Sequence, residues 1–324
     1  VSIKTVSRVI NNEYGVSKTT KSKVLKSIKA LDYNPNKAAQ GLRSKKSFLI
    51  GLVYDNPDKF YLSDIQSGVL ETCAKNGFSV VLFPCNHKEK DLTEKLIEFA
   101  KRTNLDGIIL TPPISDMKEL VRNLQLKIPL CVVSPGLLTS NPLCVSSDDF
   151  KATYSMTCHL IKQGHKEIGF IKGHKDHGAT QHRLDGYLDA LSDNNIQIKQ
   201  ENITEGDFSF DSGEIAAKQL LKKGASKVTA IFASNDAMAA GVLKAAHKAK
   251  INIPNDISLV GFDNSPTASQ AWPSITTIAQ PIKEMASSAA QILIDNISNK
   301  SEKKNVNKVF GSELIFRESV KKIN

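Results

Sequence analysis

The sequence lacks a hydrophobic run that is long enough to cross a membrane. Its apolar runs, such as residues 257–262, are far shorter than the roughly 18 residues that a bilayer-spanning helix needs. It also does not open with the charged and then apolar segments of an export signal. We therefore expect a cytoplasmic protein without a membrane partner.

Cysteine is scarce, and its spacing shows no pairing. The five cysteines are odd in number and lack the close spacing of a zinc site. They are Cys73, Cys85, Cys131, Cys144 and Cys158. We expect buried free thiols, which a reducing compartment favours.

The fingerprints of cofactor-dependent enzymes are missing as well. No Gly-x-Gly-x-x-Gly follows an expected strand, and no Gly-Lys-Ser/Thr loop is present to hold a phosphate. One stretch resembles a metal site, and it holds His174, Asp176, His177 and His182. We interpret these as histidines of a glycine-containing loop. The sequence therefore predicts no catalysis, no cofactor and no metal.

Positive charge is concentrated at the start of the chain. Residues 1–46 contain 11 Lys or Arg against only Glu13 and Asp32, a net charge of +9. The whole chain carries +10, so the remaining 278 residues contribute only +1. Such concentration is typical of a module that binds nucleic-acid phosphates.

Residues 2–11 predict a helix that suits the major groove of DNA, with Ser2 as its N-cap. The apolar side of the helical wheel holds Val6, Val9 and Ile10. The polar side holds Lys4, Ser7, Arg8 and Asn11. Such side chains match the donors and acceptors of base edges. A solvated surface helix fits the segment alone about equally well, and the local basic charge favours DNA binding.

A second helix and a short third helix are expected next. Ser17 is placed to cap the second helix. The apolar positions of that helix are Val24, Ile28 and Leu31. It ends before Pro35, because a proline disfavours helical geometry at the residue before it. A helix as short as the expected third one is marginal alone, so we expect it to fold only when something holds it.

From residue 48 onwards, strand-like and helix-like segments alternate. The expected strands are 48–53, 79–83, 107–110, 130–133, 168–171, 230–233 and 258–262. Helical stretches between them include 62–76, 93–102, 154–163 and 237–249. Continuous apolar strands that alternate with helices favour parallel sheets covered on both faces. The two series predict an α/β fold with two doubly wound parallel-sheet lobes.

Motifs along the chain carry a family resemblance. They are VSIKTVSRVIN (1–11), YNPN (33–36), LR (42–43), IGL (50–52), LDGIIL (105–110), HLIKQGH (159–165), RLDGY (183–187), ASNDAMA (233–239), GFDN (261–264), PSITTI (273–278) and RES (317–319). In this order they resemble the lactose repressor–galactose repressor (LacI/GalR) family of bacterial transcription regulators. No single motif decides the match, but together they span essentially the whole chain.

The resemblance implies a helix-turn-helix head, a hinge helix and a two-lobed core similar to periplasmic sugar-binding proteins. The head would comprise residues 1–46 with the hinge helix at 36–43, and the effector-binding core would comprise 47–324. The N-lobe would hold about 47–147 and 280–307, and the C-lobe about 148–279 and 308–319. The small head would be all α.

The same resemblance implies a set of DNA contacts. They are Ile3, Lys4, Thr5, Ser7, Arg8 and Asn11 in the recognition helix, with Ser17, Thr20 and Lys21 on phosphates. Ile3 and Lys4 occupy the family's variable specificity positions, and Arg8 suits guanine. Leu42 matches the hinge leucine that wedges into the minor groove, with plain packing as the alternative.

The front of the chain departs from the family pattern. The family's head has a further helix that ends near Val1, and that helix is absent from the chain as given. Val6, Val24 and Ile28 then lack an apolar partner. We expect the chain as given to bind operator poorly and the full-length protein to bind well, which a gel-shift comparison tests.

Side chains at the carboxyl ends of strands define the expected effector site, because ligands bind there in open parallel sheets. They are Asp55, Ser134, Asn235 and Asp263. Arg183 matches the family's ligand-gripping arginine, and Gln280 follows a segment that passes between the lobes. Stacking faces for a sugar could come from Phe60, Tyr61, Phe208 and Trp272, with ordinary packing as the alternative. Asp148 and Asp236 are interpreted as helix caps.

These residues favour a polyhydroxylated ligand, since planar polar side chains bond adjacent hydroxyls in pairs. We expect a sugar effector, a glucoside or other oligosaccharide rather than a purine, that controls a homodimer on double-stranded operator DNA. A dimer is preferred to a tetramer because no heptad tail follows residue 319. The alternative functions are a periplasmic-type sugar-binding protein without DNA function, which the basic head opposes, and an enzyme, which needs a cofactor fingerprint.

Overall fold

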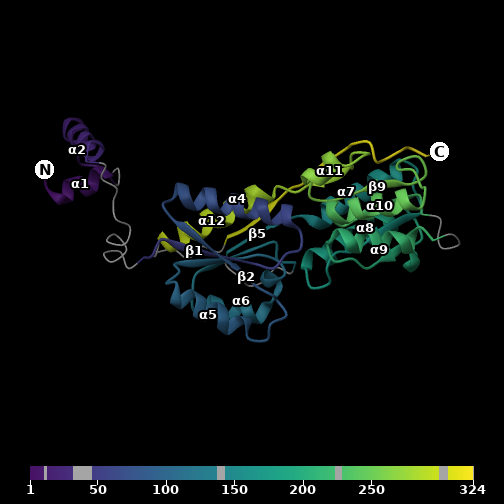
Figure 1. Cartoon of the computed structure of the whole chain (residues 1–324), viewed down its shortest axis with the longest axis horizontal. Helices are drawn as coiled ribbons and strands as arrows, with labels where there is room; N and C mark the ends of the chain where they lie inside the picture. Colours follow the sequence, from purple (N-terminus) through teal and green to yellow (C-terminus); the bar gives the residue numbers. More distant parts are fainter. Residues whose placement is uncertain (11–12, 32–45, 137–142, 223–227, 299–305, 324) are drawn as a thin grey trace. The chain divides into compact units, whose positions relative to one another are not determined.

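The computed structural model describes residues 1–10, 13–31, 46–136, 143–222, 228–298 and 306–323. The chain forms two compact units, Val1–Phe48 and Leu49–Asn324. Figure 1 shows the first unit as purple helices and the second as an α/β unit coloured from blue to yellow.

The first unit contains the helices α1 (Ile3–Ile10) and α2 (Lys18–Ala30). Both predicted serine caps are confirmed. Ser2 Oγ accepts the Thr5 N–H at 3.2 Å, and Ser17 Oγ accepts the Thr20 N–H at 3.3 Å. The expected hinge helix at 36–43 lies outside the described residues.

The first lobe of the second unit contains a six-stranded sheet of order β11-β5-β4-β3-β1-β2, in which all neighbours are parallel. Its strands are β1 (Leu49–Tyr54), β2 (Ser79–Pro84), β3 (Gly107–Leu110), β4 (Leu130–Val133), β5 (Leu143–Ser147) and β11 (Val306–Phe310). Every residue of β3 and β4 is buried. This burial confirms the expectation of a parallel sheet with helices on both faces.

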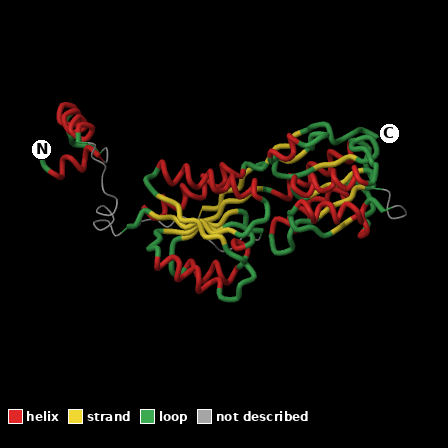
Figure 2. Tube along the Cα trace, in the orientation of Figure 1, coloured by secondary structure: helices red, strands yellow, loops and turns green. Residues whose placement is uncertain are grey.

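Helices cover both faces of this sheet (Figure 2). They are α4 (Lys59–Lys75) and α12 (Ile282–Ser298) on one face, and α5 (Leu92–Arg102) and α6 (Lys118–Gln125), preceded by the 3₁₀ turn η1 (Ile114–Asp116), on the other. Helices α4 and α12 pack closely against each other. A Cβ at Gly68 of α4 would lie 2.3 Å from the Lys283 carbonyl oxygen, so this approach requires glycine.

The second lobe contains a four-stranded parallel sheet of order β7-β6-β8-β9. Its strands are β6 (Ile168–Ile171), β7 (Ile203–Thr204), β8 (Ala230–Ala233) and β9 (Ser258–Val260). The helices are α7 (Asp149–Lys162), α8 (Gly178–Asp193), α9 (Phe210–Leu220), α10 (Asp236–Lys248) and α11 (Pro266–Gln270), with the 3₁₀ turn η2 (Gln200–Asn202). Neighbouring residues of β8 face opposite ways: Phe232 packs with α7 and α8, and Ile231 with α9 and α10.

The chain passes between the lobes three times. It crosses after β5, after β10 (Thr277–Ala279) and between β11 and β12 (Glu313–Ile315), and β10 pairs with β12 in an antiparallel ladder. The expected last boundary at residue 307 falls inside β11. Because β11 pairs with β5, this crossing lies after Phe310 instead.

All seven predicted strands are present, although β9 ends at Val260 rather than at residue 262. Cys73, Cys131 and Cys144 are buried free thiols, as expected, whereas Cys85 and Cys158 are only half-buried. Among the described helices, none has the length and apolar character needed to span a lipid bilayer.

Candidate functional site

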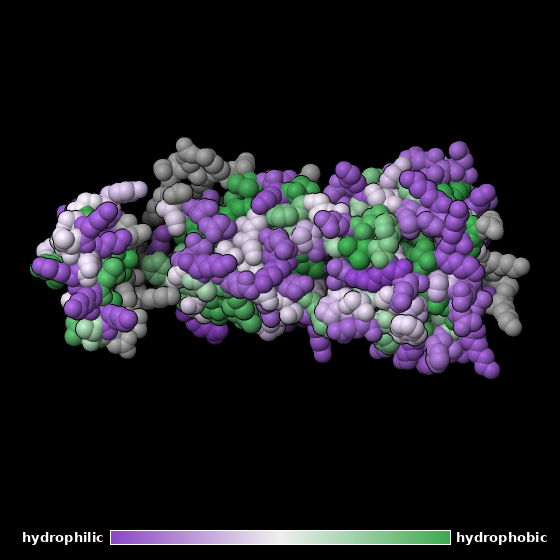
Figure 3. Space-filling view, turned by 90° about the horizontal axis from the view of Figure 1, so that it is seen from above, coloured by the Kyte–Doolittle hydropathy of each residue, from purple (hydrophilic) through white to green (hydrophobic). Residues whose placement is uncertain are grey.

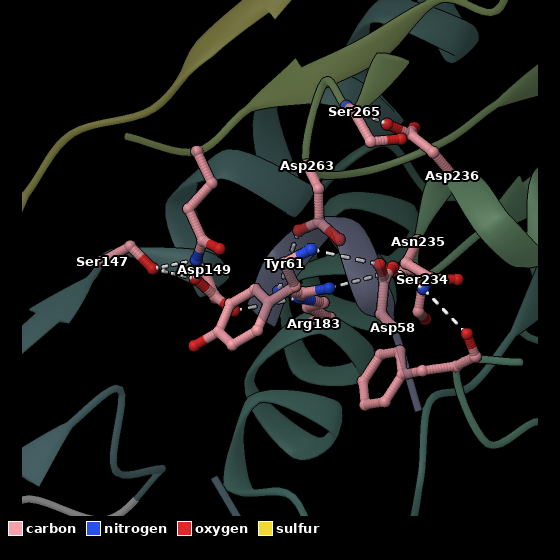
Figure 4. A network of polar contacts seen from close by, with 12 residues as sticks. Asp58, Tyr61, Ser147, Asp149, Arg183, Ser234, Asn235, Asp236, Asp263 and Ser265 are labelled. Carbon is pink, nitrogen blue, oxygen red and sulfur yellow. Dashed lines mark hydrogen bonds and ion pairs between the residues drawn. The ribbon is translucent and has the colours of Figure 1, made fainter. Parts of the chain in front are cut away.

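A cavity lies between the two lobes of the second unit, at the carboxyl ends of their parallel strands. It is lined by Asn56, Asp58, Tyr61, Pro112, Ser134, Asp149, His177, Ala179, Arg183, Phe208, Asn235, Asp263 and Gln280. Parallel strands of both sheets end here, so loops of both lobes contribute side chains. Figure 4 shows the polar network of this inter-lobe cavity.

Arg183 of α8 organises the network (Figure 4). Its Nε donates to Asp149 Oδ2 at 2.9 Å, and its Nη1 donates to the Ser234 carbonyl oxygen. Its Nη2 lies 3.9 Å from Asp263 Oδ1, and the guanidinium carbon lies 3.6 Å from the centre of the Phe262 ring. The buried guanidinium is thus balanced by two carboxylates and stacked on an aromatic face.

Gln280 joins this network from the crossing segment after β10. Its Nε2 donates to Asp149 Oδ1 at 3.1 Å and to Ser147 Oγ. Ser147 Oγ in turn donates to Asp149 Oδ1. The Asp149 carboxylate at the start of α7 therefore connects the end of β5 to the crossing segment after β10.

Asp58 and Asn235 form a direct hydrogen bond between the lobes. Asp58 caps α4, because its Oδ1 accepts the N–H groups of Phe60 at 2.9 Å and Tyr61 at 3.1 Å. Its other oxygen accepts Asn235 Nδ2 at 2.9 Å. Asn235 caps α10 through its own Oδ1, which accepts the Met238 N–H at 2.9 Å. Two helix caps, one from each lobe, thus meet in the cavity.

Four buried polar atoms that line the cavity make no hydrogen bond within the described part of the chain. They are Tyr61 Oη, Ser134 Oγ, Asp263 Oδ1 and Gln280 Oε1. Burial raises the pKa of both the Tyr61 hydroxyl and the Asp263 carboxyl. A buried polar atom without a partner costs roughly 1–3 kcal/mol, so this group is suited to a polar ligand.

Three lining residues also have strained backbones. Ser134, Phe208 and Asp263 have φ angles of 48°, 70° and 104°, in a region that residues with a Cβ rarely adopt. Such strain costs on the order of 1–3 kcal/mol per residue and concentrates at ligand-binding sites. The strain therefore supports the cavity as the functional site of the second unit.

The lobes lie close together around the cavity. Asp116 of η1 accepts the N–H of Gly136 at 2.6 Å from its own lobe and the N–H of Gly178 at 3.1 Å from the other. A Cβ on Gly136 would lie 1.9 Å from the Gly178 Cα, so both positions need glycine. The cavity measures about 40 Å³, whereas ligand pockets usually measure roughly 300–1,000 Å³. A ligand therefore requires the lobes or side chains to move apart.

The structure brings seven of the ten residues predicted for the effector site to this cavity. They are Tyr61, Ser134, Arg183, Phe208, Asn235, Asp263 and Gln280. Three do not line it. Trp272 is 85% exposed, in the loop between α11 and β10, and Phe60 lies on the exposed side of the first turn of α4. Asp55 instead accepts a hydrogen bond from His87 Nδ1 at 2.6 Å.

Other lining residues were not predicted from the sequence. For two of them, Asp58 and Asp149, the sequence contains a feature that could have identified them. Asp58 precedes an apolar helix as an N-cap would, and Asp149 opens the helix that Asp148 caps. The expected cap role of Asp236 is wrong, because Asn235 caps α10. Asp236 accepts the Ser265 N–H at 2.7 Å, and burial raises its pKa to about 7.

His177 is the one residue of the predicted metal-like stretch that lines the cavity. It is buried, and burial lowers its pKa to about 3, assisted by the nearby His174 and His87. A neutral imidazole therefore faces the cavity at physiological pH.

The first unit places its predicted DNA contacts on exposed or half-buried positions. Ile3 and Lys4 are exposed, and Thr5, Ser7 and Arg8 are half-buried. The Arg8 guanidinium approaches the Glu13 carboxylate at 4.0 Å. Figure 3 shows hydrophilic and hydrophobic residues side by side on this unit. Asn11 and Leu42 lie outside the described residues.

Comparison with known proteins agrees with this architecture. The family model of bacterial regulatory proteins of the lacI family matches residues 1–36, and that of a periplasmic binding protein-like domain matches 157–320. The chain is 32% identical to the HTH-type transcriptional repressor PurR of Vibrio vulnificus over 100% of its length and 96% of the relative's. It is 32% identical to the HTH-type transcriptional regulator MalR of Clostridium butyricum over 98% of its length and 96% of the relative's.

Two solved structures are similar over the whole chain. A complex of the transcriptional regulator CelR with cellobiose has a TM-score of 0.77 and 29% identity, and covers 98% of this chain and 96% of its own. The lac repressor dimer bound to operator has a TM-score of 0.81 and 26% identity, and covers 99% of this chain and 96% of its own.

A DNA-binding head joined to a two-lobed, ligand-binding core defines the class of ligand-controlled transcription regulators. The chain belongs to the lacI family of bacterial regulatory proteins. The match over the first 36 residues removes the alternative of a sugar-binding protein without DNA function. Its relatives are transcriptional regulators rather than enzymes.

Proposed function

We propose that the protein represses transcription as a homodimer on a pseudo-palindromic operator, and that an oligosaccharide in the inter-lobe cavity controls it. The observation that carries this proposal is the group of four buried polar atoms beside Phe208 and Arg183 that make no hydrogen bond within the described part of the chain. Hydroxyls of a sugar satisfy such atoms, and an aromatic face covers the ring. The complex of a similar regulator with cellobiose supports this ligand class.

Control follows from the three crossings between the lobes. A ligand that holds the lobes at a new separation moves the segments after β5, β10 and β11. Gln280, in the segment after β10, is hydrogen-bonded to Ser147 and Asp149 in the segment around the end of β5, so these two segments move together. The packing of the subunits then changes, and with it the spacing of the hinge segments at 36–43. The ligand thereby shifts the population between dimers that bind operator and dimers that do not.

The head reads DNA with the exposed side of α1. Ile3, Lys4, Thr5, Ser7, Arg8 and Asn11 face the bases, and Ser17, Thr20 and Lys21 hold phosphates. Leu42 wedges into the minor groove at the centre of the paired site. The protein acts in the cytoplasm, where its operator lies, and it works by binding rather than by catalysis.

Calorimetry tests the ligand class. We expect cellobiose, maltose or a longer glucoside to bind at one site per chain, and hypoxanthine and guanine not to bind. Tyr61→Phe should weaken sugar binding about 3–10-fold, because it removes one hydrogen bond without changing the ring. Phe60→Leu is the matched control and should bind normally, since Phe60 does not line the cavity. Tight binding of a purine base would overturn the sugar assignment.

A further inference from the structure

A cluster of metal-binding side chains lies beside the inter-lobe cavity and draws on both lobes. His87 lies in the loop after β2 in the first lobe, and His174 and Asp176 lie in the loop after β6 in the second. The ligand atoms of these three residues all lie within 4.8 Å of one another. From the sequence alone, the stretch that holds His174, Asp176, His177 and His182 is interpreted as a loop without a metal, and His87 is not singled out.

The geometry is close to that of a three-ligand metal site. Asp176 Oδ2 lies 3.1 Å from His87 Nε2 and 3.9 Å from His174 Nδ1. Ligands at about 2.0–2.2 Å from a tetrahedral zinc ion are about 3.3–3.5 Å apart, so small side-chain movements suffice. The rings of His87 and His174 meet edge to face, with centroids 5.5 Å apart.

A second carboxylate orients His87. Asp55 Oδ2 accepts both the His87 backbone N–H at 2.8 Å and, at 2.6 Å, the proton of Nδ1. This bond directs the lone pair of Nε2 towards Asp176, in the carboxylate–histidine–metal arrangement of many zinc proteins. Two acceptors 3.1 Å apart repel unless a proton or a cation lies between them.

The ligand set also indicates the class of ion. His174 Nδ1 accepts the backbone N–H of Asp176 at 3.1 Å, so an ion bound at this nitrogen takes the place of that hydrogen bond. Two imidazoles and one carboxylate suit Zn²⁺ and similar transition-metal ions, whereas Mg²⁺ prefers oxygen ligands. Three protein ligands leave a fourth position for water.

We propose that His87, His174 and Asp176 bind one zinc-type divalent ion that bridges the two lobes, with Asp55 positioning His87. The ion holds the loops after β2 and β6 together, so it favours the arrangement in which Asp58 and Asn235 are also joined. An effector that prefers the same arrangement then binds more tightly when the ion is present, and the ion binds more tightly with the effector. Only this coupling rests on the proposed function; binding of the ion does not.

The site is tested by titrating metal-free protein with Zn²⁺ in a calorimeter and with Co²⁺ as a visible-absorption probe. We expect one ion per chain, no binding of Mg²⁺, and a melting temperature raised by about 5–10 °C at a 100-fold excess of Zn²⁺ over its Kd. His87→Ala, His174→Ala and Asp176→Asn should each weaken binding at least tenfold, and Asp55→Asn about 10–100-fold. His247→Ala, an exposed histidine of α10, is the matched control and should bind normally.

Similar losses of metal affinity from the substitution in the first lobe and from those in the second support an ion that bridges the lobes. Binding that survives His87→Ala but not His174→Ala would place the ion on one loop and overturn the bridge. Binding that survives all three ligand substitutions, or no binding of Zn²⁺ to the unaltered protein, would overturn the site itself. In the last case a proton, rather than a metal, joins His87 to Asp176.

Discussion

Replacing Arg183 by methionine is expected to lower the free energy of unfolding of the second unit by about 3–5 kcal/mol and to abolish the response to effector. Methionine keeps much of the side-chain volume over the Phe262 ring but removes the charge. Asp149 and Asp263 are then buried without their common cation. Urea unfolding followed by circular dichroism measures the stability, and calorimetry measures effector binding.

A second substitution separates the lost charge from lost packing. Asp149→Asn in the Arg183→Met background removes one of the uncompensated carboxylates, so it should recover part of the stability. The ability to bind effector should not return, because the donors of the guanidinium remain absent. An Arg183→Met protein as stable as the original would contradict the role given to this buried network.

Replacing Arg8 by alanine is expected to weaken operator binding by about 1–3 kcal/mol, or roughly 5–150-fold, and to relax discrimination at one base pair. Arg8 lies near the middle of the polar side of α1 and reaches guanine through two parallel donors in the proposed complex. Fluorescence anisotropy on operators selected from random duplexes measures both effects.

Lys21→Ala provides the contrast for Arg8→Ala. A phosphate contact carries no sequence information, so this variant should lose affinity on all duplexes and reduce the slope of log affinity against log salt by about 1. If Arg8→Ala weakens operator and random duplexes equally, Arg8 contacts the backbone and not a base.

The sequence predicts the sheets well because a strand that is apolar on both sides is stable only where both of its faces are covered. Residues 107–110 and 130–133 have no polar side that could face water, so they must lie inside a covered parallel sheet. β11 was not among the predicted strands. Its residues are half-buried or exposed, so an apolar run does not mark it. Only its pairing with β5 shows that the chain remains in the first lobe as far as Phe310.

The cavity was predicted in part, and the errors have identifiable causes. Ser134, Asn235 and Asp263 follow strands directly, so strand topology alone places them at the site. Trp272 was assigned to the cavity because aromatic rings stack on sugars, but it belongs to an exposed surface loop. Asp58 was missed because its second role, the bond to Asn235, depends on a lobe far along the chain.

The role proposed for His87 could not be predicted from the residues around it in the sequence. Nothing near it in the sequence suggests a ligand set, since its partners His174 and Asp176 follow 87 and 89 residues later. The fold brings the two loops together, so that His87 Nε2 in the loop after β2 lies 3.1 Å from Asp176 Oδ2 in the loop after β6. Side-chain clusters of this kind depend on topology, which the apolar pattern determines only coarsely.

The affinity of the protein for its selected operator, measured with and without saturating effector, tests the central claim most directly. The account predicts a change of at least fivefold in either direction on the operator, little change on a random duplex, and none in the Arg183→Met variant. Identical operator affinity in both conditions, or no preference for any duplex over random DNA at moderate salt, would contradict control of a DNA-reading head by a ligand between two lobes.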